Sequence, residues 1–345
     1  MIAINVRNVN DAILEGITLL RTKGEQVESR NGPTLEMNCP VATTYQRPWE
    51  RVVLSNVRDA NPFFHLMEAM WILAGRCDVK FLTEFNKRMA DYSDDGEEFN
   101  APYGYRMRVA VNMQIVPQPF DQIQHVISIL RNDPNSRQAV IQIWDSEDLN
   151  KSTKDKACNM SVVFRIRKGA LHMTVYNRSN DILWGAYGAN VVQFSMLQEY
   201  VAAHLGVHMG PYTQITNSYH VYTTGPGGEL WDKLLARYQN NSLLYRNSFT
   251  DFVTMFKKDI TRFDNDLKTM FYLYDNHGLS ELGKYSAWQS TYFKKLVAPM
   301  IRVHLIHKSH GPYKAMEHTH EILADDWRYA SDIWLSNRIL ARNTK

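Results

Sequence analysis

The stretch that decides how this chain folds is Tyr176-Asn177-Arg178-Ser179-Asn180-Asp181, which follows shortly after Ala157-Cys158-Asn159. Apolar runs at Met160 to Ile166 and Leu171 to Tyr176 predict two neighbouring strands. A lone cysteine is often only a small buried apolar residue. Here, however, the cysteine stands at the head of one strand, and an arginine, a serine and an aspartate stand at the end of the next. That combination suits an anionic substrate held beside a nucleophile.

The surrounding sequence predicts a mixture of strands and helices. Extended segments are expected in the polar region Gln26 to Pro33 and at Thr43 to Val57, Ala139 to Trp144 and Tyr212 to Tyr222. Helices are expected from the start of the chain to Lys23-Gly24, and at Phe63 to Ala74, Phe120 to Leu130 and Asn190 to Leu205. The polar stretch Arg76 to Tyr103 is expected to be irregular, ending in a turn at Pro102-Tyr103-Gly104.

After Gly225-Pro226-Gly227-Gly228 the pattern changes to helices alone. Successive helices are expected at Leu230 to Tyr238, Asp251 to Leu273, Tyr285 to His304 and Met316 to Leu340. The sequence therefore predicts an α+β catalytic domain over residues 1–228 and a helical C-terminal extension over residues 229–345.

Composition narrows the class of protein. The net charge is +3, from 39 basic and 36 acidic side chains without a long basic run, so general nucleic-acid binding is not indicated. Three cysteines, irregularly spaced, favour neither a disulfide framework nor a zinc site and point to a reducing compartment. No apolar stretch reaches membrane-spanning length. We expect a cytoplasmic protein.

Several side chains allow both a functional and a structural interpretation. Glu68 lies on the apolar face of a predicted helix, where a carboxyl group serves either general acid–base chemistry or a structural hydrogen bond. Asn190 begins a helix, where an N-cap is the ordinary role. The histidines near the C-terminus have no acidic or cysteine partners at a recognisable spacing, so we expect no metal site; they are His304, His307, His310, His318 and His320.

Taken in order, the quoted segments resemble the thymidylate synthase superfamily, which includes phage-type deoxyuridylate and deoxycytidylate hydroxymethylases. The resemblance covers roughly residues 10–225 and rests on the ordered set rather than on any single motif. The set comprises Arg30, Glu68, Pro102-Tyr103-Gly104, Asn132 to Arg137, Cys158, Arg178 to Asp181, Gly185, Asn190 and His220-Val221-Tyr222. It implies a homodimeric α+β fold with a large twisted mixed sheet flanked by helices.

The resemblance also implies roles for nucleotide-binding and catalytic residues. Cys158 would attack C6 of a pyrimidine 5′-monophosphate, and Glu68 would move protons at the base. Tyr103 belongs to the same catalytic group, and Asn190 would read the base edge. The remaining substrate ligands would be Arg30, Arg178 and Ser179 for the phosphate, Arg137 for the partner subunit's phosphate, and His220 and Tyr222 for the sugar hydroxyl.

The one-carbon donor implied by the resemblance is 5,10-methylenetetrahydrofolate. Asp181 would hold its pterin ring, with Trp184 and Gly185 beside it. No metal is implied.

Departures from the synthase pattern carry information about the product. Ala157 and Asn159 replace the proline and histidine that flank the nucleophile in synthases, and Ser136-Arg137-Gln138 lacks one of two arginines. Met89 to Ser93 lacks the tryptophans that cover the reactive methylene, leaving a gap that we expect at Ala90, although Trp184 could refill part of it. Water reaching that carbon gives hydroxymethyl instead of methyl. The synthases' C-terminal closing tail is also replaced by the helical extension.

These departures favour hydroxymethylation of dUMP. Asn190 matches the asparagine that pairs with uracil in synthases, but an amide can present either polarity. The loop from Gly185 to Asn190 is one residue longer than in synthases, which leaves the pairing geometry open.

Three alternatives remain. Two are a deoxycytidylate hydroxymethylase and an ordinary thymidylate synthase. The third is a binding protein whose helical extension docks nucleotide-synthesis or replication proteins.

Overall fold

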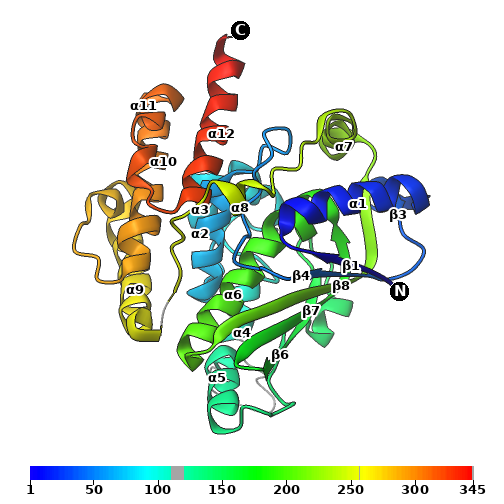
Figure 1. The fold of residues 1–345 in the computed structure, drawn as a ribbon, viewed down its shortest axis with the longest axis horizontal. Coiled ribbons are helices and arrows are strands. Elements are labelled where there is room, and N and C mark those ends of the chain that lie inside the picture. Colours follow the sequence, from blue (N-terminus) through cyan, green and yellow to red (C-terminus); the bar gives the residue numbers. More distant parts are fainter. Residues whose placement is uncertain (110–119, 256, 344–345) are drawn as a thin grey trace.

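The computed structural model describes residues 1–109, 120–255 and 257–343 (Figure 1). Its centre is an eight-stranded sheet in the order β1-β4-β8-β7-β6-β5, with the β2–β3 hairpin joined through β3 to β8. The β1–β4 and β7–β8 pairs are parallel and the other pairs antiparallel, which confirms the predicted mixed sheet and α+β class. The strands are β1 (Ile2–Val6), β2 (Glu25–Ser29), β3 (Gly32–Glu36), β4 (Val41–Tyr45), β5 (Val140–Gln142), β6 (Asn159–Arg167), β7 (Ala170–Asp181) and β8 (His208–Tyr222).

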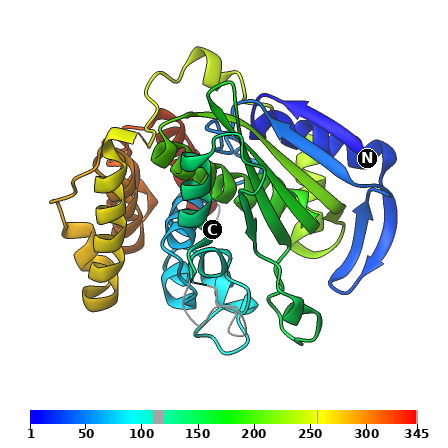
Figure 2. The same cartoon turned by 90° about the horizontal axis from the view of Figure 1, so that it is seen from below.

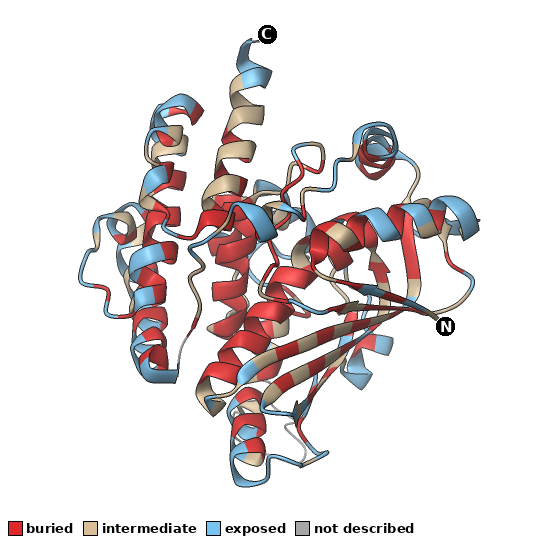
Figure 3. Ribbon diagram, in the orientation of Figure 1, coloured by how far each residue is buried: buried red, intermediate tan, exposed pale blue. Residues whose placement is uncertain are grey.

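One face of the sheet is covered by helix α6 (Asn190–Leu205), which contacts both β7 and β8. Helix α2 (Pro62–Leu73) packs on α6, and α5 (Gln122–Asn132) lies beside it. Figure 3 shows both α2 and α6 buried along most of their length, and every residue of α2 is buried. A helix that is apolar on all sides needs such enclosure, which explains the composition of Phe63 to Leu73.

Helix α1 (Val9–Lys23) lies against β1 and begins at Asn8, whose side chain accepts hydrogen bonds from the backbone N–H groups of Asn10 and Asp11.

The opposite face of the sheet keeps part of its surface accessible. Along β8, Tyr212 and Gln214 are buried, whereas Thr213 and Ile215 alternate with them and are only half-buried. The same alternation on β7 leaves Tyr176 exposed. This period of two is the pattern of a sheet with one face on the core and one face free for another surface.

The described chain after Gly225 is helical, as predicted. Its α-helices are α7 (Gly225–Arg237), α8 (Leu244–Asn247), α9 (Ile260–Lys284), α10 (Ala298–His310), α11 (Pro312–Met316) and α12 (Asp325–Asn343). Shorter segments are the 3-10 turns η4 (Lys257–Asp259) and η6 (Thr319–Glu321) and the π-helical η5 (Phe293–Val297). Figure 2 shows α9 and α10 at one end of the molecule and the β2–β3 hairpin at the other. The division into two domains at residue 228 stays a prediction.

The C-terminal helices complete the core around α2. Trp334 of α12 packs edge-on against Phe63 of α2, with ring centres 5.5 Å apart. His304 of α10 lies 4.6 Å from the Phe85 ring, and its Nε2 is 3.0 Å from the Glu84 carbonyl oxygen. Phe63, Phe85 and Trp334 belong to one continuous hydrophobic core shared with the sheet.

Several predicted boundaries were wrong. The first residues form strand β1 before helix α1 because Ile4 and Val6 alternate with exposed residues against the core. The stretch expected to be irregular contains helix α3 (Val79–Phe85), which is capped by the Asp78 carboxylate accepting from Phe81 N–H, and the turn η1 (Lys87–Tyr92).

Further boundaries differ from the prediction. Tyr103, which was predicted to lie in a turn, begins helix α4 (Tyr103–Arg108). The segment predicted to be extended as far as Val57 is a strand, β4, only as far as Tyr45. A short turn, η2 (Ser146–Leu149), follows β5. In the C-terminal stretch, α9 begins only at Ile260 and α12 only at Asp325. None of the described helices is long and apolar enough to cross a membrane.

Candidate active site

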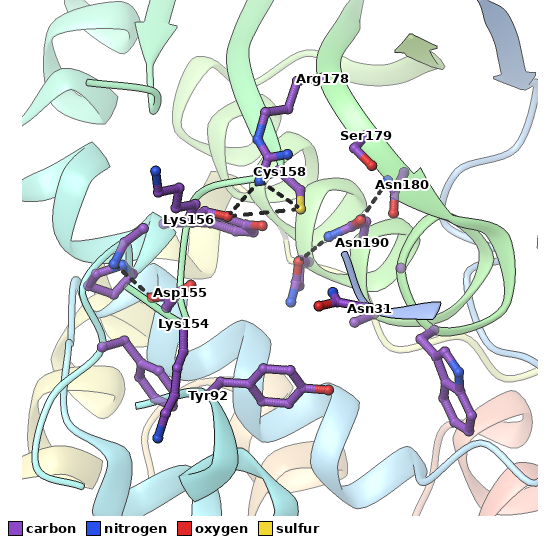
Figure 4. A pocket seen from close by; sticks show the side chains of 18 of the residues that line it. Asn31, Tyr92, Lys154, Asp155, Lys156, Cys158, Arg178, Ser179, Asn180 and Asn190 are labelled. Atoms are coloured by element: carbon purple, nitrogen blue, oxygen red, sulfur yellow. Dashed lines mark hydrogen bonds between the residues drawn. The ribbon is translucent and has the colours of Figure 1, made fainter. Parts of the chain in front are cut away.

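A cavity of about 670 Å³ opens where the ends of β7 and β8 meet α2 and the β2–β3 hairpin (Figure 4). Its volume lies within the usual range for sites that bind small molecules. Its walls combine apolar residues such as Trp71, Ile72 and Leu82 with charged and polar groups, including Cys158 and Arg178. It therefore has the composition of a ligand site.

Cys158 lies directly before β6, beside Arg178 of the neighbouring strand β7. The strands bring them together because Arg178 N–H donates to the Cys158 carbonyl oxygen at 3.0 Å. The Arg178 side chain also holds the preceding loop, donating from Nε to the Ala157 carbonyl oxygen at 2.9 Å, and its Nη2 is 3.8 Å from the Cys158 sulfur. Burial raises the pKa of the thiol, and the nearby Arg178 charge opposes that effect.

The β2–β3 hairpin brings Arg30 and Asn31 over the end of β8. Thr34 and Glu36 of β3 pair with Tyr222 and His220 of β8, which fixes the position of the hairpin turn. Asn31 Nδ2 donates to the Tyr222 hydroxyl at 3.4 Å. The predicted phosphate and sugar ligands thus line one region of the cavity, where Ser179 joins them.

Glu68 enters the cavity from α2 and is 7% exposed. Burial raises the pKa of its carboxyl group to about 7, although a hydrogen bond from the Gln193 side chain acts in the opposite direction. Its Oε2 atom has no hydrogen-bond partner within the described residues. A carboxyl group with one free oxygen and a pKa near neutrality can accept a proton from a ligand and return it.

Asn190 at the start of α6 is bound on both sides by other side-chain amides. Asn180 Nδ2 donates to Asn190 Oδ1 at 2.8 Å, and Asn190 Nδ2 donates to Gln193 Oε1 at 2.8 Å. Asn190 is therefore not an N-cap by its side chain, since its amide faces the cavity and its neighbours. The extra residue predicted between Gly185 and Asn190 lies in a π-helical segment, η3 (Ile182–Ala189), that leads directly into α6.

Tyr103 lines the cavity from the first turn of α4. Burial raises the pKa of its phenol, and its neighbours include Asn159 and Cys158. The helix that carries it approaches α2 closely because Gly104 has no side chain. A Cβ atom at Gly104 would lie 2.2 Å from the Ile72 carbonyl oxygen.

The three predicted folate ligands differ in position. Trp184 and Gly185 line the cavity, and the Arg58 guanidinium lies 4.6 Å from the centre of the Trp184 ring. Asp181 lies outside the lining residues. One of its carboxylate oxygens accepts from Leu183 and Trp184 N–H, both at 2.7 Å, so it caps η3. Its predicted contact with a pterin stays a prediction.

Most predicted site residues meet in this cavity, but Arg137 and Ala90 lie outside it, as Asp181 does. Arg137 is exposed in the turn before β5, outside the cavity of its own chain. Ala90 is exposed as well, and the wall next to it is formed by Met89 and Tyr92. Figure 4 shows Tyr92 reaching into the cavity from the side opposite Cys158 and Asn190.

Sequence reasoning missed several lining residues, namely Tyr92, Trp144, Lys154, Asp155, Asn180 and Gln193. Two of them carried a usable signal. Asn180 belongs to the quoted Arg-Ser-Asn-Asp segment, and Gln193 lies three residues after Asn190, on the same side of a helix.

Among the residues that the structure describes, no group of three or more histidine, cysteine, aspartate or glutamate side chains could hold a metal ion. The C-terminal histidines have structural surroundings instead. His304 packs in the core, where burial lowers its pKa to about 4, and the Nδ1 of His318 is 2.9 Å from a carboxylate oxygen of Glu321.

Comparison with known proteins agrees with the site. A family model described as thymidylate synthase matches residues 14–270. The deoxyuridylate hydroxymethyltransferase of Pseudomonas phage M6 is 36% identical over 355 aligned positions, which cover 98% of this chain and 95% of that protein. The enzyme of the same name from Bacillus phage SP01 is 42% identical over 207 positions, covering 59% of this chain and 54% of that protein.

A more distant relative is the thymidylate synthase of Symbiobacterium thermophilum. It is 31% identical over 172 positions, which cover 46% of this chain and 59% of that protein. The match to the phage M6 protein, by contrast, extends through the helical C-terminal stretch.

Proposed function

The chain belongs to the thymidylate synthase family, and on that premise we propose that it transfers a hydroxymethyl group to C5 of dUMP. The observation that carries the proposal is the pairing of Cys158 with Arg178 at the edge of a cavity that Glu68 also enters. The nearly full-length similarity to a deoxyuridylate hydroxymethyltransferase supports the choice of substrate and product. The carbon donor proposed is 5,10-methylenetetrahydrofolate.

The chemistry assigned to Cys158 is addition of its thiolate to C6 of the base. Addition makes C5 a nucleophilic enolate carbon, which forms a bond to the one-carbon unit. The donor supplies that unit at the oxidation level of formaldehyde. Loss of the C5 proton would then break the bond between the one-carbon unit and the folate nitrogen and leave an exocyclic methylene. The hydroxide of one water adds to this methylene, the thiolate leaves, and the folate would take up the C5 proton and the remaining proton of the water. The net change at C5 is replacement of H by CH2OH, and the folate leaves as tetrahydrofolate without oxidation.

Glu68 is suited to the proton transfers at the base. With a pKa of about 7, both its protonated and its ionised forms are present near neutral pH. The arginines act on the other side of the cavity, where Arg178 and Arg30 favour the thiolate and offer positive charge to a phosphate.

The apolar part of the cavity supports the proposal that the folate binds there. Trp71, Ile72, Leu82 and Met89 form a wall suited to flat aromatic rings, and Trp184 lies nearby with 42% of its surface exposed.

The preference for hydroxymethyl over methyl rests on the wall formed by η1. Met89 and Tyr92 line the cavity in the stretch where the resemblance to synthases leads us to expect an indole shield that this chain lacks. Tyr92 is 56% exposed and brings a hydroxyl group that can hydrogen-bond to a water molecule. Stacking of the Arg58 guanidinium on Trp184 holds that indole at η3. Both features favour access of water to the methylene carbon.

A homodimer with shared active sites is part of the proposal. The half-buried face of β7 and β8, with Thr213, Ile215 and Tyr176, offers a surface for a second copy. Arg137 is exposed and outside its own cavity, as expected for a residue that serves the partner's phosphate. Docking of other nucleotide-synthesis or replication proteins on the C-terminal helices stays a prediction.

The test is incubation of the protein with methylenetetrahydrofolate and dUMP or dCMP, followed by mass analysis of the nucleotide. We expect dUMP to gain CH2O without the absorbance change that accompanies dihydrofolate formation. The Cys158→Ser variant, which is nearly isosteric, should keep the fold and form no product. A gain of CH2 with stoichiometric dihydrofolate would identify a synthase, a gain by dCMP a cytidylate enzyme, and no gain a binding protein.

A further inference from the structure

Three side-chain amides form a chain of hydrogen bonds across the wall of the cavity. Asn180 at the end of β7, Asn190 at the start of α6 and Gln193 one turn later are 4%, 6% and 6% exposed. The two bonds that link them are both 2.8 Å long, and Figure 4 shows the one between Asn180 and Asn190 facing the cavity. Such a buried chain can hold only a few arrangements of donors and acceptors.

The direction of the chain is determined at its Glu68 end. In its ionised form Glu68 only accepts hydrogen bonds, so the Gln193 amide then directs its N–H group to Glu68. Its oxygen then faces Asn190, which must direct Nδ2 toward Gln193 and Oδ1 toward Asn180. Each group thus determines the orientation of the next, and the reversible amide of Asn190 is left with one orientation.

We propose that Asn180 and Gln193 are positioning residues that set the base preference of the site by fixing the orientation of the Asn190 amide. This inference rests on the proposed function, in which Asn190 reads the edge of a pyrimidine. After bonding to its neighbours, Asn190 retains one N–H donor and one acceptor lone pair for a ligand. The donor lies on the Gln193 side and the acceptor on the Asn180 side.

That arrangement matches uracil and opposes cytosine. Uracil presents an acceptor at O4 and a donor at N3, whereas cytosine presents a donor at N4 and an acceptor at N3. Cytosine would require the Asn190 amide to turn over, and this would place donor against donor at Asn180 and acceptor against acceptor at Gln193. Binding cytosine would therefore break both hydrogen bonds of the chain, so the loss of free energy involves three buried amides and not the Asn190 side chain alone.

The local backbone is built around this chain. A Cβ atom at Gly185 would lie 1.9 Å from Asn180 Oδ1, so the Asn180 side chain occupies space that only a glycine leaves free. The π-helical segment η3 then ends at Ala189, which sets Asn190 and Gln193 on the first turn of α6. The connection between Gly185 and Asn190 is therefore compatible with the hydrogen bonds among the side-chain amides of Asn180, Asn190 and Gln193.

The test compares binding of dUMP and dCMP by calorimetry in the absence of folate. Gln193→Met removes the anchor at nearly constant size, and Asn180→Asp replaces a donor by an acceptor. We expect the wild type to bind dUMP more tightly, and each variant to lower the ratio of dUMP to dCMP affinity by about tenfold or more. The ratio of kcat/KM values for the two nucleotides should follow the same change.

Ser179→Ala is the matched control, because it weakens phosphate binding and should reduce the affinity for both nucleotides equally. An unchanged ratio in a folded Gln193→Met protein overturns the inference, and Asn180→Asp decides if the first variant does not fold. A wild type that binds dCMP as tightly as dUMP also overturns it. Because these measurements need no carbon transfer, a protein that binds dUMP but makes methyl instead of hydroxymethyl refutes only the proposed function.

Discussion

At the scale of single residues, the site holds two ionisable groups under opposing influences. Burial raises the pKa of both Cys158 and Glu68, while a neighbouring guanidinium acts on the thiol and a neighbouring amide acts on the carboxyl group. Each group therefore keeps its proton more readily than in water, and each is exposed to a partner that favours losing it. This is the condition under which a side chain changes protonation during a reaction.

The raised pKa of Glu68 predicts a penalty on stability that grows with pH. The carboxyl group titrates near 4.5 in the unfolded chain and at about 7 in the folded protein. Between these values the folded state binds more protons, so the free energy of unfolding falls as the pH rises, by a total of about 3 kcal/mol. Glu68→Gln removes this term and keeps an acceptor for Gln193.

Urea unfolding at a series of pH values checks the prediction. Relative to wild type, the Glu68→Gln variant should gain stability from pH 4.5 to pH 7 and gain no more above pH 8, while its turnover is lost. Parallel pH curves for the two proteins would contradict a raised pKa at Glu68.

The sequence predicted correctly which residues lie close together where they stand on strands that are consecutive in the chain. Cys158 and Arg178 could be paired because β6 and β7 follow each other in the chain and in the sheet. The chain from Asn180 to Gln193 could not be predicted, because it depends on the π-helical turn η3 and on the orientation of three amides. The gap expected at Ala90 stays a prediction: Ala90 is exposed, and its neighbours in η1, Met89 and Tyr92, line the cavity.

At the scale of elements, the contact between α2 and α4 decides where Glu68 and Tyr103 lie. The two helices approach at Gly104, where a Cβ atom would meet the backbone of Ile72 at 2.2 Å. Backbone cannot move aside as a side chain can, so any larger residue at position 104 forces the two helices apart. The sequence predicted a turn at Tyr103-Gly104, because a helix of six residues is too short to show the periodic spacing of apolar residues that identifies a helix.

Gly104→Ala should therefore lower the free energy of unfolding by about 1–3 kcal/mol, because the helices must separate. Urea unfolding measures the loss, and turnover should fall with it as Tyr103 moves. Gly283→Ala is the matched control in a helix, where the added methyl meets only the flexible Leu305 side chain. An equal, small effect of both changes would show that the contact is looser than 2.2 Å implies.

At the scale of the whole molecule, the proposed dimer would link two features, the half-buried face of β7 and β8 and the exposed Arg137. An isolated chain would keep Thr213, Ile215 and Tyr176 accessible and would leave its arginine far from any phosphate. A two-fold dimer over this face buries the first set and gives the arginine a site.

Mixing two inactive variants tests the dimer. Cys158→Ser lacks the nucleophile and Arg137→Ala lacks the phosphate ligand, so neither homodimer should turn over. In a mixed dimer one of the two sites has both groups, and an equal mixture should recover about one quarter of the wild-type sites. A monomer with full activity, or a mixture as inactive as its parts, would refute shared sites.

The enclosure of α2 by distant helices has a consequence for the order in which the protein is made. Residues 62–73 leave the ribosome long before α10 and α12, which pack on them. At typical rates of synthesis the delay is roughly ten to fifty seconds, during which the mostly apolar helix α2 lacks part of its cover. We therefore expect α2 to keep part of its apolar surface uncovered during this interval, where a chaperone can bind it.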